Sequence, residues 1–551
     1  MSLTLAKFSP SLQMPYKVAR CQIVDTISLD GGEKTTRRSK LVEKTKLSVS
    51  CSDTAWIMEN QQLDGSKKSP KTYPPQIYNQ LCAIDNLQNL GIDHKYFKNE
   101  INNTLDNIYR LWLQRDEEIY LDVTCCALGF RLLRSNGYDV SSDSLNQFSE
   151  EEQFFSLVSP QFKSTNTILE LFKASKLIIY ENEPILEKLE AWTDSFLKQQ
   201  ILIGAIKDSK LHEKVDHALR YQYDTLDFLE TRWEIEHQKA NSVKLLKSSY
   251  RWVKIGKFDE LEFARILLLF CYYPVTAILV APQFADARTS FTKNCIVATV
   301  VDDFFDVAGS KEELENLVQL IERWGEAKTI GYSSKQVEFI FLALESMIKE
   351  LDVIAFKHHG RNVEQHLVKI WYELVKSMMK EAEWTRENAT PSLDEYMKNA
   401  YISMALGPIC YITTYFLGIT LPEEVMDGPQ IYNLFKHISL VGRLHNDIRT
   451  FKREREQGKY NSVALRIFHS QGSMTEEEAI KETKQDIEKY RKELLRLSIQ
   501  ENSIPKPLKD FFWKCGKMMY YVYMENDGYS NPKEEMANDA KLVIWEPLSF
   551  A

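Results

Sequence analysis

The sequence contains few of the residues that interrupt regular structure. It has 20 Gly and 17 Pro among 551 residues, so a loop-rich or all-β fold is not expected. Its nine cysteines include no Cys-x-x-Cys pair, which argues against a zinc site or a disulfide framework and indicates reduced core thiols. An excess of basic residues is also missing, and the net charge of −9 gives no footprint for nucleic-acid binding.

Long apolar runs are scarce too. The most apolar stretch, residues 266–282, spans 17 residues, contains Pro274 and is flanked by Arg265 and Asp286. It is marginal for a membrane span, which needs about 20 apolar residues. We therefore expect a buried pair of helices in a soluble protein with no membrane span. Hydrophobic residues make up 44% of the chain and charged residues 27%, as in ordinary globular proteins.

The most informative stretch is V-V-D-D-F-F-D-V at residues 300–307. On a helix, Asp302 and Asp306 lie one turn apart on the same face, roughly 6 Å along the axis. Two carboxylates at that spacing repel each other unless a cation lies between them, and Mg²⁺ binds through one or two carboxylates plus substrate phosphate. The alternative is a solvated acidic helix start, but the surrounding Phe and Val residues argue against an exposed face.

A second stretch, G-R-L-H-N-D-I-R-T-F-K-R-E at residues 442–454, carries further oxygen ligands. Asn446, Thr450 and Glu454 recur every four residues, so one helix face presents an amide, a hydroxyl and a carboxylate over two turns. Arg443 lies one turn earlier on nearly the same face, where a guanidinium could hold phosphate oxygens. Alone, this pattern could be a polar helix face with charge pairs, but the two stretches together indicate a metal site.

D-D-F-F-D followed by N-D-x-x-T-x-x-x-E resembles the two metal-binding motifs of class I plant terpene synthases. The resemblance covers the chain from about residue 75. L-D-V-T-C-C-A-L-G-F-R-L-L-R at residues 121–134, followed by G-Y-D-V at 137–140, looks like the non-catalytic helical domain of that family. D-A-R-T-S-F-T-K-N at residues 286–294 and A-L-G-P-I at 405–409 resemble its kaurene-synthase-like diterpene branch.

The resemblance implies an all-α fold with two helical domains. We expect the non-catalytic domain at residues 76–256, with a buried inner helix over 122–134, and the catalytic α-bundle at 257–551. Residues 1–50, which are rich in Ser, Thr and basic residues, resemble a plastid transit peptide; the alternative is a disordered tail. Residues 51–75 look like the remnant linker of a lost helical domain.

The resemblance also implies the site. Three Mg²⁺ ions, with Mn²⁺ as a substitute, are expected between Asp302 and Asp306 on one side and Asn446, Thr450 and Glu454 on the other. Arg443, with Arg265 and Lys459, is expected to bind the substrate diphosphate, and the catalytic residues are then Asp302, Asp306 and Arg443. Many family members carry Arg-x-Arg where this chain has Arg265 and Leu267. Arg265 could therefore instead be an arginine at the core edge whose head reaches solvent.

The A-L-G-P-I segment interrupts a helical pattern, since Pro408 removes a backbone donor. In the kaurene-synthase-like branch this break lies against the hydrocarbon, and the isoleucine, here Ile409, accompanies cyclisation beyond the pimarenyl stage. A simple structural kink is the alternative. Aromatic faces attract cations, and residues expected to surround the cavity, each of which could instead be plain core, are Trp371, Trp384, Tyr396, Tyr401, Tyr411, Tyr415, Phe416, Tyr520, Tyr521 and Tyr523.

These features predict a plastid class I diterpene synthase that ionises a copalyl-type diphosphate, normal or ent, and forms a miltiradiene-type or kaurene-type olefin. An upstream class II cyclase would supply the substrate, because the class II motif D-x-D-D is absent from this chain. One alternative is a mono- or sesquiterpene synthase acting on geranyl or farnesyl diphosphate. A chain-elongating prenyltransferase would need a second aspartate-rich motif. An inactive helical scaffold is the alternative of another class.

Overall fold

The structure, a computed structural model, describes residues 75–89, 97–157, 164–180, 182–220, 239–500 and 502–524, together with Asp527. The described residues form helices and turns and contain no strand, which confirms the predicted all-α class. The predicted transit peptide at 1–50 and all but the last residue of the predicted linker at 51–75 lie outside the described residues.

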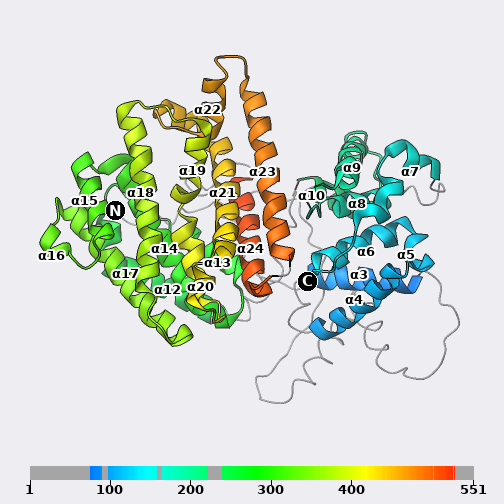
Figure 1. Cartoon of the computed structure of the whole chain (residues 1–551), viewed down its shortest axis with the longest axis horizontal. Coiled ribbons are helices and arrows are strands. Elements are labelled where there is room, and N and C mark those ends of the chain that lie inside the picture. The colour runs from blue at the N-terminus through cyan, green and yellow to red at the C-terminus, as the bar shows by residue number, and fades with distance from the viewer. Residues whose placement is uncertain are drawn as a thin grey trace, which may run out of the picture.

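The described helices form two bodies (Figure 1). The smaller body comprises α3 (Pro75–Asn89), α4 (Lys98–Leu113), α5 (Glu117–Tyr120), α6 (Val123–Ser135), η2 (Ser142–Phe148), α7 (Glu151–Leu157), α8 (Thr165–Ser175), α9 (Pro184–Leu202) and α10 (Ser209–Arg220). Helix α6 is its inner helix, as predicted: Asp122 caps it by accepting a 2.8 Å hydrogen bond from the amide of Cys125, and almost every residue that follows is buried.

The larger body carries both acidic motifs. Its first helices are α12 (Lys239–Ile255), η4 (Phe258–Glu260), α13 (Leu268–Ile278), η5 (Pro282–Phe284), α14 (Ala285–Asp303), η6 (Phe304–Ala308), α15 (Lys311–Glu322), α16 (Ala327–Ile330) and α17 (Lys335–His359). The later ones are α18 (Glu364–Glu387), α19 (Leu393–Ser403), η7 (Gly407–Tyr411), η8 (Ile412–Phe416), α20 (Glu423–Met426), α21 (Pro429–Glu456), α22 (Ser462–His469), α23 (Glu476–Ile499) and α24 (Lys506–Tyr523).

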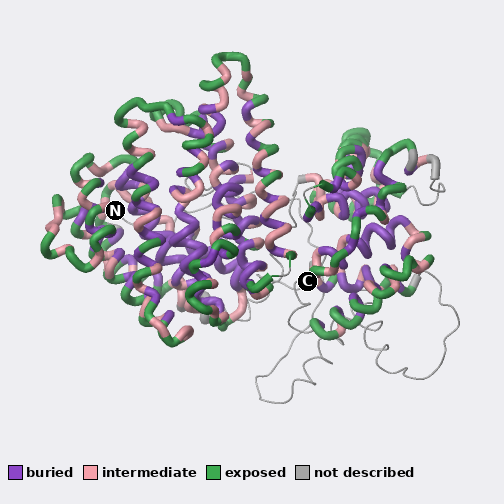
Figure 2. Tube along the Cα trace, viewed as in Figure 1, coloured by how far each residue is buried: buried purple, intermediate pink, exposed green. Residues whose placement is uncertain are grey.

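Each body has a hydrophobic core of its own, visible as the buried segments inside each body in Figure 2. One core draws its buried side chains from Ile77 to Val215, and the other from Val253 to Tyr523. Helix α12 therefore contributes Val253 to the core of the larger body. The predicted domain limits, with their boundary between residues 256 and 257, stay a prediction.

Two helical runs of the larger body are interrupted where the sequence analysis placed functional segments. Helix α14 changes after Asp303 into the π-turn η6, closed by a 2.8 Å bond from the amide of Gly309 to the carbonyl of Phe304. Helix α19 ends at Ser403; Ala405 then adopts a left-handed conformation with φ of 63°, and the π-turn η7 and the 3₁₀ turn η8 follow. The predicted interruption around Pro408 is thus confirmed.

The apolar stretch at residues 266–282 does not form the expected pair of helices. It forms the single helix α13, which continues through Pro274. Helix α13 packs against α14 and α24, and burial on both sides outweighs the one backbone hydrogen bond that proline removes. No described helix is long and apolar enough to cross a bilayer.

A buried ion pair anchors the smaller body and offers a test of its stability. Arg134, which is inaccessible to solvent, donates to both carboxylate oxygens of Glu183 at 2.9 and 3.0 Å and to the carbonyls of Val140 and Leu177. Arg134→Met leaves Glu183 buried without its cation, so we expect the free energy of unfolding to fall by about 3 kcal/mol or more in urea titrations.

Lys188→Met is the matched control, because the ion pair of Lys188 with Glu150 is exposed. It should cost less than about 1 kcal/mol. Equal losses in the two variants would contradict the assignment of Arg134 as the anchor.

Candidate active site

A cavity of about 460 Å³ opens in the larger body, lined from α13, α14, α18, α19, α21 and α24 and from the turns beside them. Every predicted site residue except Thr450 lines it: Arg265, Asp302, Asp306, Ile409, Arg443, Asn446, Glu454 and Lys459. Residues separated by up to 194 positions in sequence, Arg265 and Lys459 among them, therefore meet around one space.

Asp302 and Asp306 reach the cavity from the junction of α14 and η6. The Asp302 side chain is 43% exposed and lines the cavity. Desolvation there raises the pKa of Asp302 to about 7, and the neighbouring charge of Asp306 adds to the shift, whereas Arg265 opposes it. The site thus favours a positive group between the two carboxylates.

Arg265 and Lys459 supply positive charge to these acids. The Nη2 atom of Arg265 donates to Oδ2 of Asp302 at 2.9 Å, and its backbone amide and Nε each donate to the carboxylate of Asp303 at 2.7 Å. Lys459 donates from Nζ to Oδ2 of Asp306 at 2.5 Å. Asp303, the buried aspartate of the motif, holds the Arg265 side chain in place. Arg265 lines the cavity.

The second motif lies on the last three turns of α21. Asn446 and Glu454, eight residues apart, both face the cavity, as their spacing predicts. Thr450 is buried and does not line the cavity; its hydroxyl donates to the carbonyl of Asn446 at 3.0 Å, a common arrangement for threonine in a helix.

Asn461 and Asp447 support this motif, and the sequence analysis did not identify them. Asn461 caps α22 and donates from Nδ2 to Glu454 at 2.7 Å and to the carbonyl of Asp447 at 3.1 Å. Asp447 is fully buried and accepts hydrogen bonds from the hydroxyl of Tyr396 and the amide of Ser462. Burial raises its pKa to about 6. These bonds hold the loop at residues 457–461, with Lys459, against α21.

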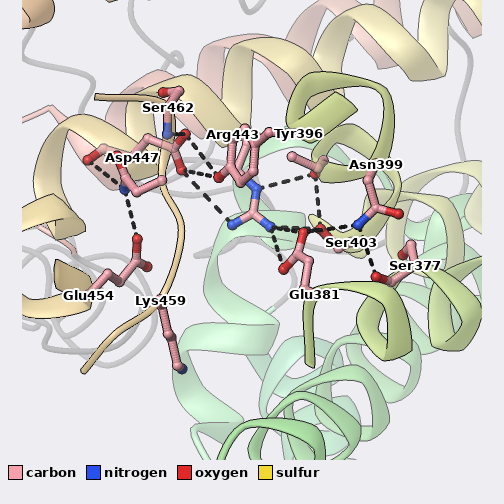
Figure 3. A network of polar contacts seen from close by, with 12 residues as sticks. Ser377, Glu381, Tyr396, Asn399, Ser403, Arg443, Asp447, Glu454, Lys459 and Ser462 are labelled. Carbon is pink, nitrogen blue, oxygen red and sulfur yellow. Dashed lines mark hydrogen bonds and ion pairs between the residues drawn. The ribbon is translucent and has the colours of Figure 1, made fainter. Parts of the chain in front are cut away.

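Arg443 occupies a slot between α18, α19 and its own helix. In Figure 3 its guanidinium lies with Asp447 on one side and with Glu381 and Ser403 on the other. Nη2 donates to Oγ of Ser403 at 2.7 Å and to Oε1 of Glu381 at 3.3 Å, and Nε donates to the carbonyl of Ala400 at 3.2 Å. Glu381 also lines the cavity. A buried guanidinium requires an anion, but nothing in the sequence shows which distant acid supplies it.

The rest of the cavity wall is largely apolar. Of the aromatic residues expected to surround it, Trp384, Tyr396 and Tyr523 line the cavity, and the other seven do not. Tyr460 and three phenylalanines of α13, α14 and η6 add further aromatic lining. The phenylalanines and the thioether and aliphatic side chains of the wall are Phe270, Phe291, Phe305, Met378, Leu406, Ile409, Met518, Met519 and Val522. Ile409 follows directly after the interruption at Ala405, as expected.

The predicted ligands that line the cavity offer oxygen atoms from three carboxylates and an amide, which suit a hard divalent cation. Among the described residues, no three His, Cys, Asp or Glu side chains converge closely enough to hold a metal ion by themselves. Mg²⁺ commonly takes one or two carboxylates and completes its shell with water and substrate phosphate. The residues present therefore fit magnesium that is bound together with a phosphorylated ligand.

Residues 254–493 match a family model described as the metal binding domain of the terpene synthase family, and residues 34–219 match the terpene synthase N-terminal domain. Ent-kaurene synthase-like 1 of Ricinus communis is 42% identical over 521 residues, which cover 87% of this chain and 70% of that protein. The chain belongs to the terpene synthase family.

Other terpene synthases show the same relation. Ent-beyerene synthase of Ricinus communis, a protein named as chloroplastic, is 43% identical over 514 residues, which are 87% of this chain but 65% of that protein. This chain thus spans less than two thirds of that relative's length. Among solved structures, abietadiene synthase from Abies grandis superposes with a TM-score of 0.76 at 23% identity, covering 93% of this chain and 72% of that one. Isoprene synthase from grey poplar gives 0.77 at 23% identity, covering 95% and 99%. Both share the fold.

The pairing of Lys459 with Asp306 leads to a binding prediction. The ammonium group of Lys459 forms an ion pair with the carboxylate of Asp306, which a divalent cation would need as a ligand. Lys459→Met is therefore expected to tighten Mn²⁺ binding to the terpene synthase in the absence of diphosphate by about fivefold, in isothermal titrations of the full chain.

Lys452→Met is the control, since Lys452 lies on α21 shortly before the loop that carries Lys459, pairs with Glu476 and is exposed. It should leave Mn²⁺ affinity unchanged. Unchanged or weaker binding in Lys459→Met would show that Lys459 and the metal do not compete.

Proposed function

We propose that this terpene synthase is a class I diterpene synthase that ionises a copalyl-type diphosphate, of normal or ent configuration, and cyclises the resulting carbocation. The observation that carries the proposal is the mixed lining of the cavity. Asp302, Asp306, Asn446 and Glu454 line it together with arginine and lysine side chains, and most of the remaining lining residues are apolar. Such a cavity suits a ligand with an anionic head and a hydrocarbon body.

The metal set that the proposal requires is three Mg²⁺ ions, for which Mn²⁺ could substitute. Asp302 and Asp306 would hold them on one side, and Asn446, Thr450 and Glu454 on the other. Thr450 would serve as a ligand only after its hydroxyl turns away from the carbonyl of Asn446. When bound, the metal supplies Lewis-acid stabilisation of the departing diphosphate. The matched family model is that of a metal binding domain.

The chain's own residues bind the leaving group and protect the cation. Three cationic side chains carry hydrogen-bond donors at the cavity wall, those of Arg265, Arg443 and Lys459. There they would stabilise the charge that develops on the diphosphate oxygens. The largely apolar wall excludes water, which would otherwise trap the carbocation. Trp384 and the phenylalanine rings offer aromatic faces that stabilise positive charge without reacting with it.

The diterpene substrate is supported by the relatives, which are named as ent-beyerene, ent-kaurene-like, ent-sandaracopimaradiene and ent-trachylobane synthases at 39% to 43% identity. A miltiradiene-type or kaurene-type olefin is the proposed product, and a class II cyclase is the proposed source of the substrate. Because several relatives are named as chloroplastic, we place the enzyme in the plastid.

A product assay tests the proposal. The full chain with Mg²⁺ is given geranyl, farnesyl, geranylgeranyl, normal copalyl and ent-copalyl diphosphates separately, and hydrocarbon extracts are analysed by gas chromatography with mass detection. A diterpene from a copalyl isomer is expected. Turnover of geranyl or farnesyl diphosphate alone would support the mono- or sesquiterpene alternative, and no product from any substrate would support an inactive scaffold.

Asp302→Ala should lower turnover by at least about 100-fold, because the substitution removes a carboxylate from the proposed metal set. Circular dichroism should show unchanged helicity. Asp394→Ala removes an exposed aspartate of α19 that does not line the cavity, and it should keep full activity. Activity retained in Asp302→Ala would disprove the metal assignment.

Ile409 offers a test of product control. Ile409→Thr places a hydroxyl dipole against the hydrocarbon, which should favour proton loss from an early cation and shift the products toward pimaradiene-type olefins. Ile412→Thr makes the same change at a buried position outside the cavity and should lower stability without changing the product ratio. An unchanged product profile in Ile409→Thr would leave the interruption as a structural kink only.

A further inference from the structure

Three cations of the cavity wall each face a carboxylate. Arg265 pairs with Asp302 at 2.9 Å, Lys459 pairs with Asp306 at 2.5 Å, and Arg443 pairs with Glu381 at 3.3 Å. The first two acids belong to the proposed metal set, so metal binding would take Asp302 from Arg265, which keeps Asp303, and would take Asp306 from Lys459. Glu381 lies outside that set. Arg443 would therefore keep its carboxylate partner even when the metals are bound.

Glu381 is held in place by two neutral donors. Ser403 donates from Oγ to Oε1 at 2.5 Å, and Asn399 donates from Nδ2 to the same oxygen at 3.3 Å (Figure 3). The amide of Asn399 is fixed in turn by a 2.9 Å bond to the carbonyl of Ser377 on α18. The carboxylate side chain remains 31% exposed and lines the cavity. The carboxylate of Glu381 is thus held at the cavity wall and is not buried in the core.

Glu454, which also acts electrostatically on Arg443, belongs to the proposed metal set. The remaining anion near Arg443, Asp447, cannot serve as an exchangeable partner. Asp447 is fully buried, lies 4.0 Å from Nη1 of Arg443, and is committed to the hydroxyl of Tyr396 and the amide of Ser462. Of Glu381 and Asp447, only Glu381 lines the cavity together with Arg443.

The contacts of Arg443 allow one partner to leave without freeing the side chain. The bond from Nη2 to Ser403 is 2.7 Å long and that from Nε to the carbonyl of Ala400 is 3.2 Å, whereas the two oxygens of Glu381 lie at 3.3 and 3.5 Å. The guanidinium can exchange Glu381 for another anion and keep its orientation through the two neutral acceptors.

We propose that Glu381 is a positioning residue that competes with the substrate and product diphosphate for Arg443 and thereby sets the affinity of the site for pyrophosphate. The inference rests on the proposed diphosphate chemistry. With no ligand, Glu381 balances the charge of a largely buried guanidinium. With diphosphate bound, the negative charge of Glu381 weakens the binding of the anion to Arg443. After ionisation, Glu381 pairs with Arg443 again and so assists the release of pyrophosphate.

The test is the binding of inorganic pyrophosphate to the full chain, measured by isothermal titration calorimetry with and without Mg²⁺. Glu381→Gln keeps the shape and an acceptor for Ser403 and Arg443 but removes the charge. We expect pyrophosphate to bind about tenfold more tightly in both conditions, as the removal of one charge a few ångströms from the ligand implies. Glu383→Gln removes an exposed charge of the same helix outside the cavity and should leave the affinity unchanged.

The outcomes separate the inference from the proposed function. Unchanged affinity in Glu381→Gln, with normal binding by the native chain, overturns the inference alone. Weaker binding confined to the Mg²⁺ condition overturns it in favour of a metal-ligand role, and weaker binding in both conditions with a lowered melting temperature overturns it in favour of a structural role. A native chain that binds no pyrophosphate even with Mg²⁺ overturns the proposed function and the inference together. Glu381→Asp should keep the native affinity.

Discussion

Electrostatic repulsion among carboxylates is the constraint around which the larger body is built. Asp302, Asp306, Glu381 and Glu454 face one cavity of about 460 Å³, where charges are poorly screened by water. Each has a partner that carries positive charge or donates a hydrogen bond: Arg265, Lys459, Arg443 and Asn461. Helices α14, α18 and α21 can approach one another with their acids pointing inward because these partners come from other elements. The same balance makes the site receptive to divalent cations, which can replace the protein's own cations.

Two interruptions of regular helix shape the cavity wall. The π-turn η6 turns Asp306 and Phe305 toward the cavity beside Asp302, and π-turns inside longer helices are frequent at functional sites. The interruption between α19 and η7 brings Ala405, Leu406 and Ile409 to the wall. A continuous helix would present one residue in three or four there. Irregular backbone thus supplies both the acidic end and part of the hydrocarbon surface.

The helical class and the meeting of the two motifs were predicted from the resemblance to a family. Spacing predicted which residues share a face within each motif, because side chains four or eight residues apart share a helix face wherever the helix is placed. Asn446, Glu454, Asp302 and Asp306 do line one cavity. Spacing could not show that Thr450 turns its hydroxyl to the carbonyl of Asn446, since it places a residue on a face but does not set its side-chain rotamer. Glu381 and Asn461 were missed because their partners lie 62 and 7 residues away on other elements, and no periodic pattern encodes such pairing. Aromatic density likewise did not reveal which rings face inward.

Ala405 sets a limit on how this enzyme can diverge by point mutation. Its left-handed backbone, with φ of 63°, costs about 1–2 kcal/mol for alanine and more for a branched side chain. Of the three wall positions beside the break, 405 is therefore closed to valine, isoleucine and threonine, whereas 406 and 409 have ordinary backbone requirements. Within this segment of the wall, variation of the side chain is therefore easier at 406 and 409 than at 405. New product specificities that arise in this segment would therefore come from substitutions at 406 and 409, while the backbone conformation at 405 stays unchanged.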